Sequence, residues 1–101
     1  MDKKYIIINQ HKLEFTYFGI LTKEIYHNKS IYLKDVYRFY TVNENSSLFL
    51  KAKYGPFENN KNIIITKQEG PIPELKLTDV STYYQCTEES IENFMKFFKE
   101  N

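Results

Sequence analysis

The chain of 101 residues has one cysteine, three glycines, no tryptophan and no surplus of either charge. One cysteine excludes an internal disulfide and is typical of a reducing compartment. With 14 basic and 13 acidic residues, the chain lacks the basic excess that is typical of nucleic-acid-binding proteins. No hydrophobic run approaches the length of a membrane span, and the apolar run 5–8 is too short for a signal peptide. We therefore expect a cytoplasmic protein.

Motifs that carry chemistry are also missing. The three glycines are not grouped into a phosphate-binding loop, and neither CxxC, HExxH nor a nucleophile elbow occurs. Cys86, His11 and His27 are scattered, and such lone residues are far more often a packed thiol and surface histidines. We expect no catalytic, metal-binding or cofactor-binding residues and no enzyme activity. A carboxylate pair of the glycosidase kind stays an open alternative.

What the chain does contain is an internal repeat. Residues 20–40 align with residues 64–84 without a gap, and repetition at such a period usually means that one supersecondary unit is used twice. We predict a single domain, 1–101, that contains this unit twice. The identical pairs are Ile20/Ile64, Thr22/Thr66, Lys23/Lys67, Leu33/Leu77, Asp35/Asp79, Val36/Val80 and Tyr40/Tyr84.

Alternation of apolar and polar residues predicts β-strands up to residue 85. In segment 12–18, Leu13, Phe15 and Tyr17 alternate with polar residues, and a period of two marks a sheet with one buried face. Segment 68–73 contains Gly70, Pro71 and Pro73, so we predict a connection there that cannot be a central strand. The other predicted strands are 4–9, 20–26, 30–33, 36–42, 48–53, 62–67 and 74–85.

Two irregularities are expected within these strands. Gly19 interrupts the alternation and marks a bend or bulge. An unbroken strand would carry Asp35 into the core beside Ile31 and Leu33, and a bare buried carboxylate is costly. We therefore predict a bulge or bend at residues 34–35, and the same for Asp79 in the second copy. The turn 27–29 contains Asn28, a residue type that is able to take positive φ.

The period changes to that of a helix at the C-terminal end. Thr87 is a good N-cap, and Ile91, Phe94, Met95 and Phe98 form one apolar stripe over residues 88–100. Cys86 and Ile91 occupy the positions of a hydrophobic staple. We predict an α+β, mostly β fold: a strongly bent antiparallel sheet or split barrel of about 6–7 strands, with this helix packed on it.

Part of the repeat resembles the bacterial pleckstrin-homology-like domains. In that family a strand ending in Leu-Thr leads through a hairpin to an Ile-x-Leu-x-Asp-Ile/Val segment, here residues 20–22 and 31–36. The C-terminal helix is similar to the final helix that plugs the family's barrel. The resemblance implies a split barrel that serves as a binding scaffold and catalyses no reaction.

The aromatic strand 36–42 is the best indication of a contact surface. Tyr37 and Phe39 share one face and Arg38 lies on the other, so either both faces are covered or one is a contact surface. Tyr, Phe and Arg are favoured at the centres of protein interfaces. The residues that we predict to contact a partner are Tyr37, Arg38, Phe39, Tyr54, Phe57 and Glu58.

The leading functional hypothesis is a non-catalytic protein-binding domain. Its most concrete form is a small bacterial or phage inhibitor, such as a toxin immunity protein or an anti-defence protein. A pleckstrin-homology-like module that binds lipid headgroups or peptides, with Lys23, Lys29 and Lys34 as the basic residues, is the alternative. A small nucleic-acid-binding protein or nuclease is a third. We expect a protein partner rather than a membrane or nucleic acid, and a homo-oligomer stays open.

Overall fold

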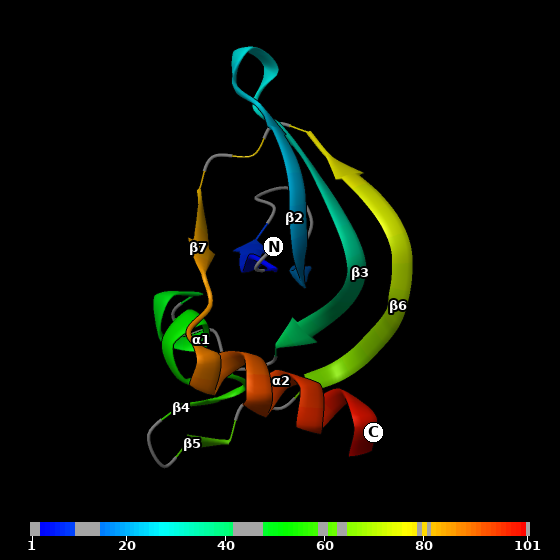
Figure 1. Ribbon diagram of the computed structural model, residues 1–101. Helices are drawn as coiled ribbons and strands as arrows, with labels where there is room; N and C mark the ends of the chain where they lie inside the picture. The colour runs from blue at the N-terminus through cyan, green and yellow to red at the C-terminus, as the bar shows by residue number, and fades with distance from the viewer. Residues whose placement is uncertain are drawn as a thin grey trace.

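An antiparallel sheet and two helices against one of its faces make up the computed structural model (Figure 1). It describes residues 3–9, 15–41, 48–58, 61–62, 65–78, 80 and 82–100. The five-stranded sheet has the order β6-β3-β2-β1-β7, and β4 and β5 form a separate two-stranded sheet. The strands are β1 (Tyr5–Asn9), β2 (Thr16–Ile25), β3 (Ser30–Thr41), β4 (Phe57–Glu58), β5 (Lys61–Asn62), β6 (Ile65–Leu77) and β7 (Tyr83–Gln85); the helices are η1 (Tyr26–Asn28), α1 (Leu48–Tyr54) and α2 (Glu88–Glu100).

This arrangement confirms the α+β, mostly β class and the C-terminal helix. The sheet is neither closed nor strongly curled, so the strongly bent sheet or split barrel that we expected is not formed. The reason lies in the strand order: β6 and β7 stand at opposite edges and do not pair with each other.

A bulge shapes the hairpin of β2 and β3, as the position of Asp35 predicted. The register shifts so that Gly19 lies opposite Asp35 and Val36, and Asp35 has a φ of 49° and is exposed. Glycine suits this position because a Cβ atom on residue 19 would meet Val36 Cγ2 at 3.0 Å, a tight contact. The bulge therefore keeps the Asp35 carboxylate in solvent while Val36 stays in the core. Asp79 lies outside the described residues.

The turn of this hairpin differs in detail from the prediction. Residues 26–28 form the short helix η1, and Lys29 rather than Asn28 takes the positive φ, at 54°. Asn28 acts instead through its side chain, whose Oδ1 accepts a hydrogen bond from the Ser30 N–H (3.2 Å). Asn28 therefore stabilises the turn as an Asx-type acceptor.

The edge strand β6 runs through segment 68–73, where we expected a connection between two strands. The predicted break at 68–73 is wrong, because β6 is continuous from Ile65 to Leu77. The predicted continuous strand 74–85 is also wrong, because β6 ends at Leu77 and β7 begins at Tyr83. Pro71 and Pro73 have no N–H to donate, which an edge strand tolerates and a central strand does not. The exclusion of this segment from the middle of the sheet is confirmed.

The two copies of the repeat have different conformations. Residues 20–40 form the β2–β3 hairpin, whereas residues 65–77 of the second copy form one strand. Proline cannot adopt the positive φ of Lys29, and Pro73 occupies the matching position. The matched segments pair with each other instead: Tyr32 lies opposite Lys76, its own equivalent in the repeat.

Helix α1 occupies the segment 48–53, which we expected to be a strand. Leu, Ala and Lys favour helices, but seven residues are too few for a helix that is stable alone. Its last four carbonyls are all satisfied by residues at the start of α2. Ser90 Oγ donates to the carbonyl of Lys51 (2.7 Å), the Thr87 N–H to that of Ala52 (2.9 Å), Thr87 Oγ1 to that of Lys53 (2.6 Å) and Asn93 Nδ2 to that of Tyr54 (2.7 Å).

Helix α2 packs on the sheet through aromatic rings. Phe94 stacks on Phe18 of β2 with the centroids 4.7 Å apart, and Phe98 stacks on Tyr37 of β3 at 4.1 Å. The predicted stripe is confirmed, since its members pack in one cluster with Phe39. Thr87 is the N-cap, because its Oγ1 accepts a hydrogen bond from the Ser90 N–H (3.1 Å).

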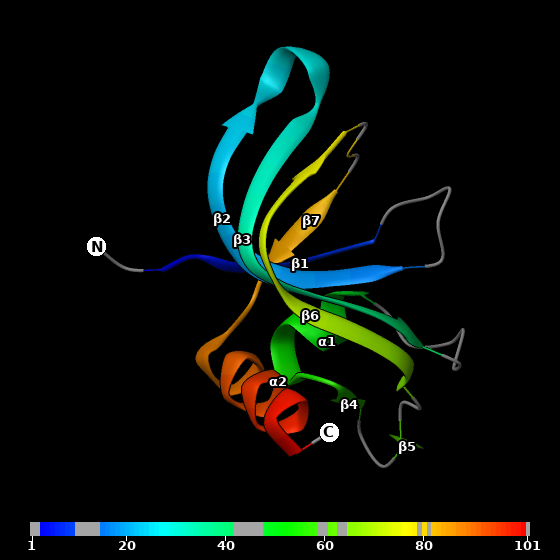
Figure 2. The ribbon, with the colours of Figure 1, turned by 90° about the vertical axis from the view of Figure 1, so that its right-hand side faces the viewer.

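The other face of the sheet has its own apolar cluster, which includes Ile8, Leu33 and Leu77. The Val80 N–H donates to the Lys29 carbonyl (2.9 Å) and so ties the connection after β6 to the tip of the β2–β3 hairpin. The hairpin projects away from the helices (Figure 2). The Cα radius of gyration is 12.7 Å, and none of the described helices is long and apolar enough to cross a bilayer.

The two hydrogen bonds of the Thr87 hydroxyl predict a measurable contribution to stability. Thr87→Ala removes the N-cap of α2 and leaves the Lys53 carbonyl without its donor, so the free energy of unfolding should fall by about 1–2 kcal/mol. Thr87→Ser keeps the hydroxyl and should retain most of the stability. Urea denaturation measures both variants, and equal stability of the alanine variant and the parent protein would contradict the role of this cap.

Candidate functional site

Two of the predicted contact residues face α2 rather than solvent. Phe39 is fully buried, with its ring 5.7 Å from that of Phe94. Tyr37 is half-buried because Phe98 covers its ring, with the two planes only 7° apart. The sequence left open whether this face of β3 is covered or is a contact surface, and in the structure α2 covers it. Phe39 is therefore not available to a partner while α2 is in place.

Arg38 is engaged within the molecule. It forms an ion pair with Glu69 of the neighbouring strand β6, and its guanidinium lies 4.5 Å from the centroid of the Phe15 ring. The Arg38 side chain keeps 30% of its surface exposed. Its role in this structure is to join β3, β6 and the residue before β2, and only its exposed fraction could meet a partner.

The remaining predicted contacts lie after α1. Tyr54 is half-buried, and the Lys53 ammonium lies 5.2 Å from the centroid of its ring. The backbone of Phe57 and Glu58 forms β4, and their side chains lie outside the described part of the structure. The structure therefore does not gather the six predicted residues into one surface.

Cys86 is packed rather than poised for chemistry. It is 7% exposed and lies in the cluster beneath α2 beside Ile91, which agrees with the predicted staple. Burial raises the pKa of the Cys86 thiol to about 12, so the reactive thiolate is disfavoured. His27 is exposed at the hairpin tip, and His11 lies outside the described residues. Within the described ranges, no three His, Cys, Asp or Glu side chains lie close enough to hold a metal ion.

An exposed aromatic pair lies where α1 meets β7. Phe49 is 54% exposed and Tyr84 37%, and their rings meet edge to face with the centroids 5.7 Å apart. Beside them is a pocket of about 260 Å³. We call this region the α1–β7 surface; its residues are Phe49, Ala52, Lys53, Tyr84, Gln85 and Thr87.

The same surface borders an open strand edge. β7 pairs with β1 on one side and has no strand on its other side among the described residues. The Cys86 N–H donates to the Tyr5 carbonyl, so in the alternating antiparallel pattern Tyr84 also bonds toward β1. The backbone groups of Tyr83 and Gln85 then point outward, where an added strand could pair with them.

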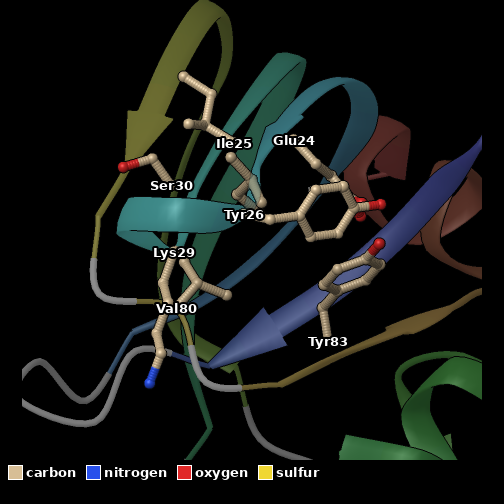
Figure 3. A pocket seen from close by; sticks show the side chains of 8 residues that line it. Glu24, Ile25, Tyr26, Lys29, Ser30, Val80 and Tyr83 are labelled. Carbon is tan, nitrogen blue, oxygen red and sulfur yellow. The ribbon is translucent and has the colours of Figure 1, made fainter.

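A second pocket lies at the tip of the β2–β3 hairpin, at the far end of the sheet (Figure 3). Its volume is about 200 Å³. The hydrogen bond between the Tyr26 hydroxyl and Glu24, and after it the negative charge of that carboxylate, raise the pKa of Tyr26. We call it the hairpin-tip pocket; it is lined by Glu24, Ile25, Tyr26, Lys29, Ser30, Ile31, Val80 and Tyr83.

The sequence analysis named Lys29 of the hairpin-tip pocket but did not single out the exposed aromatic residues Phe49, Tyr84 and Tyr26. The exposure of Phe49 depends on the helical conformation of residues 48–54. In α1, Lys51 and Ala52 are buried and Phe49 lies on the exposed side of the helix. We predicted a strand for residues 48–53 instead. Tyr26 did have a usable signal, since an aromatic residue beside a predicted turn has few neighbours to cover it.

No known family model, no curated protein and no solved structure matches this chain. A function for it must therefore be argued from the chemistry of its surfaces.

The environment of Cys86 predicts low thiol reactivity. With the pKa raised to about 12, the thiolate fraction at pH 8 should be roughly a thousandfold below that of an ordinary cysteine. A chromogenic disulfide reagent should therefore label the folded protein slowly at pH 8 and the urea-unfolded protein at once. Equally fast labelling of both forms would show that Cys86 is accessible and ionised, contrary to its packing here.

Proposed function

We propose that this chain is a non-catalytic protein-binding domain that contacts its partner through the α1–β7 surface. The observation that carries the proposal is the exposed Phe49–Tyr84 pair beside an apolar pocket. Neighbouring aromatic side chains that are exposed to solvent indicate a contact site. Aromatic residues that become buried against a partner contribute much of the binding free energy.

The open edge of β7 supports the same surface. A partner segment in extended conformation can bond to the outward backbone groups of Tyr83 and Gln85 while its side chains meet Phe49 and Tyr84. The contacts among α1, α2 and β7 hold these groups in place before binding, so little ordering is needed when a partner arrives.

A small inhibitor from a bacterial or phage conflict system is the most concrete form of this proposal. The sequence is rich in Lys, Asn and Ile, as an AT-rich gene would encode, and carries no catalytic motif. An immunity protein that blocks a toxin, or an anti-defence protein that blocks a host factor, acts by stoichiometric contact and needs only a rigid surface.

Phe49→Ser tests the surface. Affinity capture with the tagged parent protein, from cells of the organism that encodes it, should recover a protein partner. Phe49→Ser should weaken that capture at least about tenfold, since a central aromatic residue contributes on the order of 2 kcal/mol or more. Because Phe49 is largely exposed, the stability of the folded chain should change little.

Glu92→Ser is the matched control, since Glu92 is exposed on α2 away from the α1–β7 surface. This variant should capture the partner as the parent protein does. Equal loss in both variants, or undiminished capture by Phe49→Ser, would remove the α1–β7 surface as the contact site.

A lipid-headgroup or anionic-ligand module of the pleckstrin-homology-like kind is the second candidate, and one observation favours it. The ammonium groups of Lys23 and Lys76 lie 5.8 and 5.5 Å from the centroid of the Tyr32 ring, in one row across β2, β3 and β6. Lys29 and Lys34, which the resemblance also uses, are exposed. Such a row concentrates positive charge on one side of the hairpin.

Sedimentation with vesicles that contain phosphatidylserine separates the two candidates. If the second one is right, the protein binds at low salt, and Lys23→Gln with Lys76→Gln lowers the affinity roughly 30-fold, at about 1 kcal/mol per lysine. Lys96→Gln with Lys99→Gln, on the exposed side of α2, should leave binding unchanged. Protein that stays in the supernatant even at low salt would eliminate this candidate and leave the first.

A further inference from the structure

The hairpin-tip pocket contains a carboxylate that accepts the Tyr26 hydroxyl but has one unsatisfied oxygen. Glu24 lies on the inner face of β2 opposite Ile31, and its Oε1 is buried without a hydrogen-bond partner among the described residues. A buried carboxylate oxygen without a donor is costly, and native proteins seldom keep one. A ligand that supplies an N–H donor and a positive charge would complete this site.

The groups around Glu24 suit a planar cation. The hydroxyls of Tyr26 and Tyr83 lie on the same side of the pocket as the Glu24 carboxylate (Figure 3). Tyrosine rings attract cations through their faces, and the Lys4 ammonium already lies 5.7 Å from the centroid of the Tyr83 ring. Ile25, Ile31 and Val80 supply apolar walls for the alkyl part of such a ligand.

Among the residues that the structure describes, no lysine or arginine is seen to form an ion pair with Glu24. Lys29 lines the pocket, but its ammonium points away from Glu24 (Figure 3). Tyr26 is 84% exposed, so its ring has room to turn aside and admit a ligand from solvent. The aromatic ring thus stands at the entrance of the pocket, with the carboxylate behind it.

We propose that the hairpin-tip pocket binds the side chain of an arginine presented by a protein partner, with its guanidinium paired to the Glu24 carboxylate. A guanidinium offers two parallel N–H donors to a carboxylate and stacks flat on an aromatic ring, which an ammonium cannot do. Its three-carbon stem packs against Ile25, Ile31 and Val80. The proposal rests on the protein-binding function for the source of the arginine, and it adds a second contact at the opposite end of the sheet.

A small probe tests the pocket without the partner. N-acetyl-arginine methylamide is titrated into the isotopically labelled protein, and the amide chemical shifts of Ile25, Tyr26 and Val80 are followed. These signals should move together and saturate in the millimolar range. The citrulline counterpart, which has the same shape and no charge, should bind at least about tenfold more weakly because the charge-assisted pair is lost.

Glu24→Gln should weaken binding of the arginine probe about tenfold, whereas Tyr26→Phe keeps the ring and should bind within a fewfold of the parent protein. Equal binding of arginine and citrulline by the parent protein would overturn the proposal whether or not the variants fold. If N-acetyl-lysine methylamide bound as tightly as the arginine probe, the proposal that the pocket prefers a guanidinium would be contradicted. If the arginine probe binds but Phe49→Ser still captures the partner, the α1–β7 contact proposal is rejected and the arginine-binding proposal is supported. If the probe does not bind, the arginine-binding proposal is rejected whatever the result of the capture experiment.

Discussion

The joint between the two helices is the constraint on which the rest of the structure depends. The last four carbonyls of α1 all accept hydrogen bonds from Thr87, Ser90 and Asn93 of the α2 segment, and that of Lys51 also accepts the Gly55 N–H (2.9 Å). This capping fixes a seven-residue helix that would be marginal alone. It also fixes the chain that leaves β7, so Phe49 and Tyr84 are held side by side.

From this joint α2 extends under the sheet, and its rings cover the aromatic face of β3. The two surfaces for which we propose contact with a partner therefore lie away from this face: the α1–β7 surface near the joint and the hairpin tip far from it. The proposed functions of both ends are compatible, because one supplies exposed aromatic area and the other a carboxylate with one unsatisfied oxygen. Two separated contacts of unlike chemistry would make a rigid domain selective for one partner.

Features encoded by neighbouring residues could be predicted from the sequence, and features that need distant partners could not. Thr87, the apolar stripe of α2 and the bulge at Asp35 are set by local spacing and were found. Helix α1 was missed because the donors to its carbonyls lie more than 30 positions along the chain. The repeat was misleading for a similar reason: Pro73 forbids the turn of the first copy, and the two copies pair with each other. Among the predicted contacts, Phe39 is buried beneath α2, which the sequence did not reveal because a strand pattern does not tell which face a helix covers.

Amide hydrogen exchange tests the central claim, that α1, α2 and the aromatic face of β3 form one cooperative unit. If they do, the amides of both helices and of residues 36–39 exchange slowly and at a common rate set by global unfolding. If the amides of the helices exchange several orders of magnitude faster than those of β3, the claim of one cooperative unit is contradicted. The helices would then open separately, and Tyr37 and Phe39 would become the contact surface that the sequence first suggested.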